Sequence, residues 1–120
     1  MDSKVTIQEL KERAKKFCDE RDWEQYHNAK DLAIGIVTEA AELLDHFRFK
    51  SKEETEAIMK DAEKNTKIAE ELADTLYFVL RISQKYGIDI SEAFNKKMHK
   101  NEEKYPVEKA KGSNKKYTEF

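Results

Sequence analysis

The apolar residues of this chain recur mostly at the spacing of a helix, in stretches separated by polar connections. The first predicted helix runs from about Thr6 to Arg21, with an apolar side formed by Ile7, Leu10, Ala14, Phe17 and Cys18. The period breaks at residues 22–28, a connection rich in aromatic and hydrogen-bonding groups. A second helix is predicted from about Ala29 to Phe47, with Asn28 as its N-cap.

The second predicted helix is apolar nearly all round. One broad arc carries Leu32, Ile36, Ala40, Leu43 and Phe47, and Ile34 and Ala41 fall on the far side. A helix of this kind is buried more deeply than a small monomer readily allows. We therefore expect the chain to associate with further copies of itself.

The second half of the chain contains three further segments. Ser51-Lys52-Glu53-Glu54 resembles a capping box, and residues 52–67 are charged and poorly periodic, as in a short solvated helix or a mobile loop. A fourth helix is predicted from about Ile68 to Tyr86, ending at Gly87, and a last one from about Asp89 to Tyr105. Residues 107–120 read as a flexible basic tail. The pattern predicts one all-α domain, residues 1–120, built as a four- to five-helix bundle.

Composition narrows the class of protein. Apolar residues make up 38% and charged residues 40% of the 120, which suits a small bundle with solvated outer faces. The net charge of -2 gives no footprint of nucleic-acid binding, so we expect no nucleic-acid polymer as a partner. Cys18 is the single cysteine, which excludes an intrachain disulfide and a cysteine-based zinc cluster. With no signal peptide and no membrane-spanning run, we expect a soluble cytoplasmic protein without a membrane partner.

Two acidic steps interrupt the apolar helices: Glu39-Ala40-Ala41-Glu42 and Glu71-Leu72-Ala73-Asp74. Helical spacing of three residues sets the two carboxylates of each step side by side. Four carboxylates held close in apolar surroundings repel one another and lose solvation, and a divalent cation would relieve both penalties. Oxygen ligands favour hard cations such as Mg²⁺, which commonly binds through carboxylates together with substrate phosphates.

Carboxylates on neighbouring helices are also the ligands of di-iron bundles. Di-iron bundles normally need Glu-x-x-His on each of two helices, and here that spacing occurs only from Glu24 to His27, in a predicted connection, so we reject di-iron chemistry. His46 either donates a hydrogen bond to one of the acidic residues without binding the metal itself, or simply stabilises the end of its helix. No glycine-rich phosphate loop is present, so a nucleotide would be held by metal and side chains. Lys97, Asn101 and Tyr105 line one helix face that could serve this purpose.

These residues resemble the MazG-like, all-α nucleoside triphosphate pyrophosphohydrolases, and in particular their dCTP pyrophosphatase branch. The family pattern Glu-x-x-Glu, spacer, Glu-x-x-Asp is matched by Glu39, Glu42, Glu71 and Asp74. Further similar stretches cover the chain from Arg21 onward: Arg21-Asp22-Trp23-Glu24-Gln25-Tyr26-His27, Lys97-Met98 with Asn101, Tyr105-Pro106 and Lys116-Tyr117-Thr118-Glu119.

The resemblance implies a bundle that assembles as a dimer or a dimer of dimers, a homotetramer. It implies Mg²⁺-dependent hydrolysis of a nucleoside triphosphate between the α- and β-phosphates, with Mn²⁺ as a substitute metal. The four carboxylates would be the metal-binding and catalytic residues. It further implies a group of substrate-binding residues, with Trp23 enclosing the base: Trp23, His27, Phe49, Lys97, Asn101 and Tyr105.

Three positions depart from that branch, two of them at the base and one on the catalytic helix. Ala14 stands where the branch has a histidine, Phe49 where it has a base-stacking tryptophan, and Phe78 where it has a tyrosine. Phe49 can still stack, whereas Ala14 offers no hydrogen bond to a base, so the preferred base stays open. The alternative function is a non-catalytic helical interaction module whose acidic steps are solvated faces.

Overall fold

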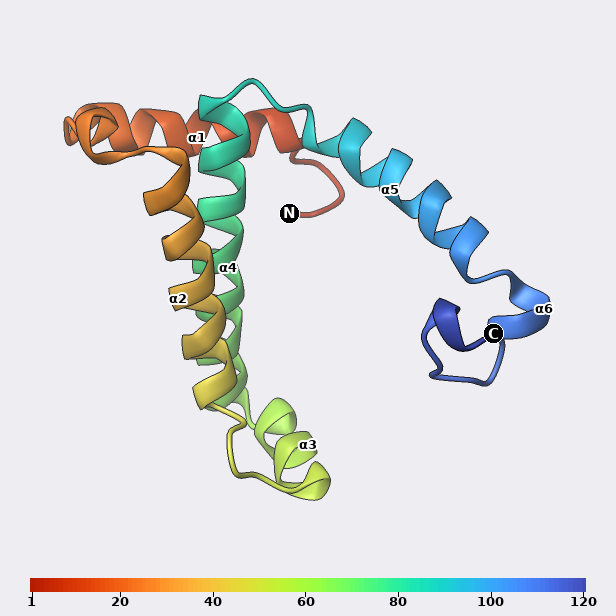
Figure 1. The fold of residues 1–120 in the computed structure, drawn as a ribbon. Helices are drawn as coiled ribbons and strands as arrows, with labels where there is room; N and C mark the ends of the chain where they lie inside the picture. The colour runs from red at the N-terminus through yellow and green to blue at the C-terminus, as the bar shows by residue number, and fades with distance from the viewer. The chain divides into compact units, whose positions relative to one another are not determined.

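The computed structural model describes residues 1–120 and contains only helical elements (Figure 1). In chain order they are α1 (Ile7–Glu20), η1 (Glu24–Tyr26), α2 (Ala29–Asp45), α3 (Lys52–Lys60), α4 (Ala62–Lys85), α5 (Ile90–Lys104), α6 (Val107–Ala110) and η2 (Tyr117–Glu119), where η marks a 3-10 helix. The chain separates into two compact units, Met1–Gly87 and Ile88–Phe120. The all-α prediction is confirmed.

Polar side chains at the helix starts explain where these helices begin. Thr6, Asn28 and Ser51 each accept a hydrogen bond from the backbone N–H three residues further on, at the starts of α1, α2 and α3. Asp89 does the same for α5. Each cap satisfies a donor that the first helical turn leaves free. The predicted Asn28 cap and the capping box at Ser51 are therefore confirmed.

The start of α4 differs from the prediction. The helix begins at Ala62 rather than at Ile68, because Asp61 caps it by accepting a hydrogen bond from the Lys64 N–H at 2.9 Å. Residues 52–67 therefore form α3 and the first turns of α4. Their charged side chains are mostly solvated, so they carry no apolar period that would reveal the helix.

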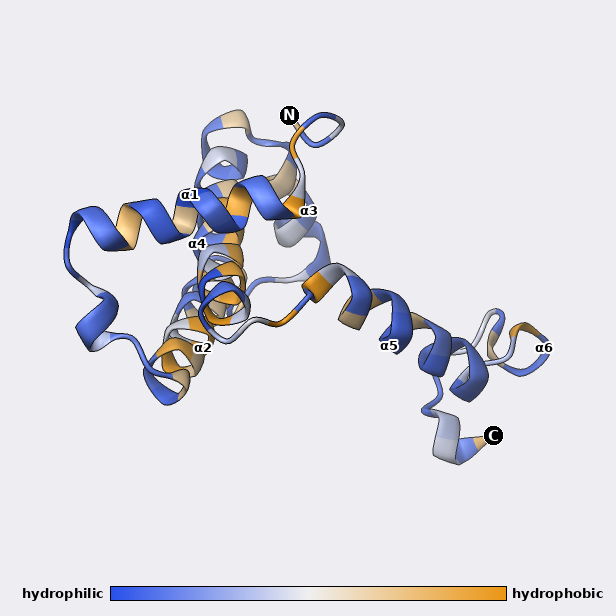
Figure 2. Cartoon of the chain, turned by 90° about the horizontal axis from the view of Figure 1, so that it is seen from above, coloured by the Kyte–Doolittle hydropathy of each residue, from blue (hydrophilic) through white to orange (hydrophobic).

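Within the first unit, α2 and α4 lie antiparallel and side by side, and α1 crosses one end of the pair (Figure 1). α3 packs against the other end of α4. In Figure 2, α2 and α4 carry most of the apolar positions, whereas α1 and α5 are predominantly hydrophilic. The buried apolar side chains come from α1, α2 and α4: Ala14, Cys18, Leu32, Ile68 and Leu80. None of the helices combines the length and the apolar composition that a membrane span requires.

The all-round apolarity of α2 is only partly covered within one chain. Leu32 is buried against the bundle, but Ile34, Val37 and Leu44 are exposed, and Val37 keeps 69% of its surface in contact with solvent. Apolar side chains this exposed on one helix mark a surface suited to association.

The second unit consists of α5, α6 and η2. Tyr105, at the end of α5, has the ring of Tyr117 edge-on at 5.9 Å and that of Phe120 at 5.8 Å. Residues 107–120, expected as a flexible basic tail, thus include two short helices and return to Tyr105.

Candidate functional site

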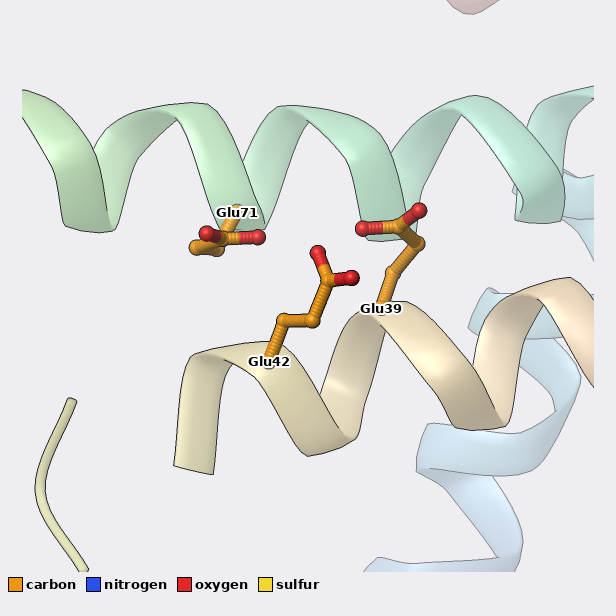
Figure 3. Close-up of side chains that lie close together, drawn as sticks. All are labelled: Glu39, Glu42 and Glu71. Atoms are coloured by element: carbon orange, nitrogen blue, oxygen red, sulfur yellow. The ribbon is translucent and has the colours of Figure 1, made fainter. Parts of the chain in front are cut away.

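Three of the predicted carboxylates converge between α2 and α4. Glu39 and Glu42 project from α2 towards α4, and the Glu71 carboxylate faces them from α4 (Figure 3). One carboxylate oxygen of each lies within 4.8 Å of the others. The geometry follows from the sequence spacing, because residues three apart lie on one helix face and the antiparallel packing of α2 and α4 turns the two acidic faces towards each other.

Two oxygens of this group lack the partners that buried carboxylates normally have. Glu39 Oε2 and Glu71 Oε2 are both buried and neither accepts a hydrogen bond from the protein. The other oxygen of Glu71 lies 3.3 Å from His46 Nε2, at the end of α2. Buried acceptors are nearly always paired in folded proteins, so two orphans in one group indicate that a cation or a donor belongs there.

Electrostatics support the same conclusion. The pKa of Glu39 is raised from its ordinary value of 4.5 to about 7, chiefly because the group is desolvated. A hydrogen bond with Glu42 raises the Glu39 pKa further, as do the charges of Glu42, Asp74 and Glu71. Like charges at this separation cannot all ionise without cost. Without a cation, Glu39 therefore ionises at a higher pH than an ordinary glutamate.

The donor set suits a hard divalent cation, because all its ligand atoms are carboxylate oxygens. Glu39, Glu42 and Glu71 could hold it directly. Asp74 lies outside the group of oxygens within 4.8 Å of one another, although its charge acts on Glu39. Of the four predicted carboxylates, the structure thus brings three together and places Asp74 one helical turn along α4 from Glu71.

A cavity of about 580 Å³ adjoins the acidic group. Glu39 and Asp74 form part of its wall, and most of the remaining wall is apolar, including Leu10, Ala14, Phe17, Leu76 and Phe78 from α1 and α4. Small-molecule sites commonly have this volume and this combination of apolar walls with a few polar groups. The cavity could therefore hold the apolar part of a ligand whose charged part lies at the carboxylates.

Gly35 permits the close approach of α2 to α4 beside the site, a role that the sequence analysis did not assign. A Cβ atom at this position would lie 2.5 Å from ring carbons of Phe78, which lines the cavity. Only glycine leaves room for that ring. The available signal was a glycine inside an apolar helix, which costs helix stability unless packing requires it.

The connection between α1 and α2 contains two predicted substrate-binding residues, Trp23 and His27. Trp23 is not among the residues that line the cavity, but its ring lies edge-on to Phe17, which does, at a centroid distance of 5.4 Å. His27 Nδ1 accepts a hydrogen bond from Arg81 Nε at 3.0 Å. Arg81 was not predicted from the sequence, although a charged residue inside the apolar stretch 76–82 was a signal for it. The structure buries this side chain.

The remaining predicted substrate-binding residues lie apart from the cavity wall or in the second unit. Phe49 follows α2 with a left-handed backbone (φ 64°) and is 90% exposed, with the Arg48 guanidinium 4.7 Å from its ring centroid. Lys97, Asn101 and Tyr105 belong to the second unit, on and just after α5.

Known proteins resemble this chain in sequence and in fold. The model of the MazG-like family matches residues 34–120. The dCTP pyrophosphatase 1 of Mus musculus is 32% identical over 115 residues, which cover 96% of this chain and 68% of the relative. The dCTP pyrophosphatase 1 of Homo sapiens is 31% identical over the same shares. A solved pyrophosphatase from Archaeoglobus fulgidus superposes with a TM-score of 0.77 at 37% identity, covering 83% of this chain and 92% of that one.

Proposed function

The chain belongs to the MazG-like family, and from this we propose that it is a Mg²⁺-dependent nucleoside triphosphate pyrophosphohydrolase that releases a nucleoside monophosphate and pyrophosphate. One observation carries the proposal: three carboxylates with two buried, unpaired oxygens adjoin a cavity of about 580 Å³. A charged triphosphate and the flat aromatic face of a base need these two environments next to each other.

The carboxylates would hold the metal, and the chain's other groups would orient them. Bound Mg²⁺ would supply charge neutralisation on the triphosphate and acidify water. His46 lies at hydrogen-bond distance from one Glu71 oxygen and so fixes how that carboxylate faces the group. A carboxylate left free by the metal would act as general base towards the attacking water.

The cavity is proposed to receive the base. Phe17 and Phe78 offer ring faces or edges against which a base can pack, and Ala14 presents only a methyl group. The named activity of the dCTP pyrophosphatase relatives makes dCTP the first substrate to test. Arg13 and Tyr77 also line the cavity, but most of its wall is aliphatic or phenyl and forms no hydrogen bond to a base edge. We therefore expect other deoxynucleotides to be accepted as well. The cellular role would be removal of surplus or damaged nucleotides.

We also propose that the enzyme is a homodimer or a homotetramer. The exposed residues Ile34, Val37 and Leu44 of α2 form the apolar surface that a second copy would cover. Sedimentation at micromolar concentration is expected to give a species larger than 14.1 kDa, and a species of only that mass would contradict the assembly.

The activity is tested by incubating the purified protein with each of the four deoxynucleoside triphosphates and Mg²⁺ and assaying pyrophosphate. Pyrophosphate release that EDTA abolishes is the expected result. The alternative of a non-catalytic interaction module predicts no release with any nucleotide and no response to Mg²⁺. The Glu39→Gln variant serves as the blank, because a contaminating enzyme would not be affected by it.

A further inference from the structure

Arg81 of α4 is a buried charge that the acidic site does not use. Its side chain is 1% exposed, and a guanidinium remains protonated even when it is buried. Burial of such a charge is tolerated only when its donors are paired. Here Nε donates to His27 Nδ1 at 3.0 Å, one terminal nitrogen donates to Gln84, and the other pairs with Glu24.

Lys85, one turn further along α4, holds the same segment of chain. Its ammonium group lies 3.1 Å from Glu24 Oε1 and donates to the Glu24 carbonyl oxygen at 3.2 Å. It also donates to the carbonyl oxygen of His27. Arg81 and Lys85 together thus bind the side chains of Glu24 and His27 and both of their carbonyl oxygens. We name this set of four residues the clasp.

The segment held by the clasp carries Trp23 and connects to the cavity through ring contacts. Trp23 lies edge-on to Phe17 at 5.4 Å, and Phe17 lies edge-on to Tyr77 at 5.9 Å. Phe17 and Tyr77 both line the cavity. Asp22, just before Trp23, has a left-handed backbone (φ 55°), an uncommon conformation that surrounding contacts must hold in place.

We propose that Arg81 is a positioning residue for substrate binding: through Glu24 and His27 it fixes the segment that places Trp23 behind Phe17, and so sets the shape of the cavity wall. The proposal rests on the proposed function, because it assigns the cavity to the base of the substrate. Arg81 is buried and each of its three nitrogens has a partner within the chain, so it acts through the segment and not by touching the nucleotide. Its loss should therefore raise KM, while kcat, which depends on Glu39, Glu42 and Glu71, stays nearly unchanged.

The hydrogen bond with Arg81 also fixes the tautomer of His27. Because Nδ1 accepts the hydrogen bond from Arg81, the ring proton of neutral His27 must lie on Nε2. Burial and the charges of Arg81 and Lys85 lower the pKa of His27, so the ring stays neutral and remains an acceptor for Arg81 at neutral pH.

Trp23 is the single tryptophan of the chain, so its fluorescence reports on the segment directly. The experiment compares the wild type with Arg81→Met, Arg81→Lys and Glu24→Gln. The control is Lys15→Ala, which breaks an exposed ion pair with Asp19 on α1, away from the clasp. For each variant we would measure acrylamide quenching of Trp23 without nucleotide, the melting temperature, and kcat and KM for dCTP.

For Arg81→Met we expect stronger quenching of Trp23 and a rise of about tenfold in KM, the range of one lost aromatic contact to a base, with kcat within about twofold of wild type. Arg81→Lys should show weaker quenching and a smaller rise in KM than Arg81→Met, because lysine keeps the charge but presents fewer donors. Lys15→Ala should change neither quantity. If Arg81→Met fails to fold, Glu24→Gln carries the test, since Glu24 is 54% exposed and its removal is milder.

A lower melting temperature with unchanged quenching and unchanged KM would overturn the proposal and leave the clasp a purely structural feature. A fall of about tenfold in kcat of Arg81→Met without a change in KM would overturn the proposal as well. If the wild type hydrolyses no nucleotide, the proposed function fails. The quenching comparison then still decides whether Arg81 positions Trp23.

Discussion

The same helix, α4, carries two polar clusters that have opposite character. At Glu71 it contributes to a group of like charges in which two buried oxygens have no partner. At Arg81 it contributes to a group of opposite charges in which the guanidinium donates from all three nitrogens. Both clusters join α4 to the region around α2, and both involve partly or fully buried groups.

The two clusters differ in whether their charged groups find partners within the chain. The clasp finds its partners within the chain, because Glu24, His27 and Gln84 each accept a hydrogen bond from one nitrogen of Arg81. The acidic group is incomplete, since its carboxylates repel one another and lose solvation without gaining donors. A complete polar cluster fixes structure, whereas an incomplete one is stabilised by a ligand from solution. The contrast therefore locates the ligand site within a chain in which 40% of the residues are charged.

The largest expected effect is the loss of turnover in Glu39→Gln. Glutamine keeps the size and helix propensity of the residue but removes the charge that a metal needs. We expect kcat to fall on the order of 100-fold or more for every nucleotide, because metal and charge stabilisation supply several kcal/mol. Steady-state assays with pyrophosphate detection measure this.

The matched control for that prediction is Glu70→Gln, an exposed neighbour of Glu71 on α4. It removes one negative charge without touching the group, so its kcat should equal that of the wild type. A Glu39→Gln variant with near-normal kcat would show that the acidic group is not the catalytic centre.

Mg²⁺ should stabilise the fold through the incomplete cluster only. A ligand that binds the native state alone adds about 2.7 kcal/mol at a hundredfold excess over its Kd, enough to raise the melting temperature by several degrees. Thermal scans in EDTA and in millimolar Mg²⁺ measure the shift. Glu71→Gln should lose most of it and Glu24→Gln should retain it. Identical midpoints for the wild type under both conditions would refute the metal site.

The two clusters should respond to pH with opposite sign in the metal-free protein. The folded pKa of Glu39, about 7, lies above its ordinary value of 4.5, so the folded state binds the proton more tightly. Its contribution to stability therefore falls as pH rises from about 4.5 to about 7. The pKa values of His27 and Glu24 are lowered from 6.5 and 4.5. Their contributions are present above those values and are lost as pH falls below them.

Urea midpoints in EDTA, taken from about pH 4 to about pH 8, separate these contributions. Glu39→Gln should remove the fall in stability between pH 4.5 and 7. His27→Gln should reduce the loss of stability that begins as pH drops below 6.5. Mg²⁺ should also remove the Glu39 dependence, because binding requires the ionised carboxylate. Unchanged profiles in both variants would show that neither group titrates as described.

The smallest effect on stability is expected for Phe49→Ala, outside both clusters. The ring is 90% exposed, so its removal should leave the melting temperature unchanged. If the ring stacks on the base, KM should rise by the equivalent of about 1–3 kcal/mol, and unequally among bases. Unchanged KM for all four deoxynucleotides would remove Phe49 from the site, whereas a drop in melting temperature would indicate packing in the assembled protein.

Much of this molecule is determined locally by its sequence. The N-caps at Asn28 and Ser51 set two helix starts, because each side chain satisfies a backbone donor within its own turn. The pairing of Glu39 with Glu42 on one face follows from helical spacing alone. Where the local signal was weak, the prediction was wrong: α4 starts at Ala62 because Asp61 caps it, in a stretch whose solvated charges show no period.

The tertiary structure decided which of the many charges are paired. Arg81 and Glu24 are separated by 57 positions in the chain, and no helical period relates them. The close contact of Gly35 with the Phe78 ring, where an added Cβ would lie only 2.5 Å from ring carbons, likewise arises only when α2 packs on α4. The same is true of the cavity beside it. Local rules specify which side chains share a face of one helix. Which faces meet, and which buried oxygens are left without a donor, depends on contacts between residues far apart in sequence.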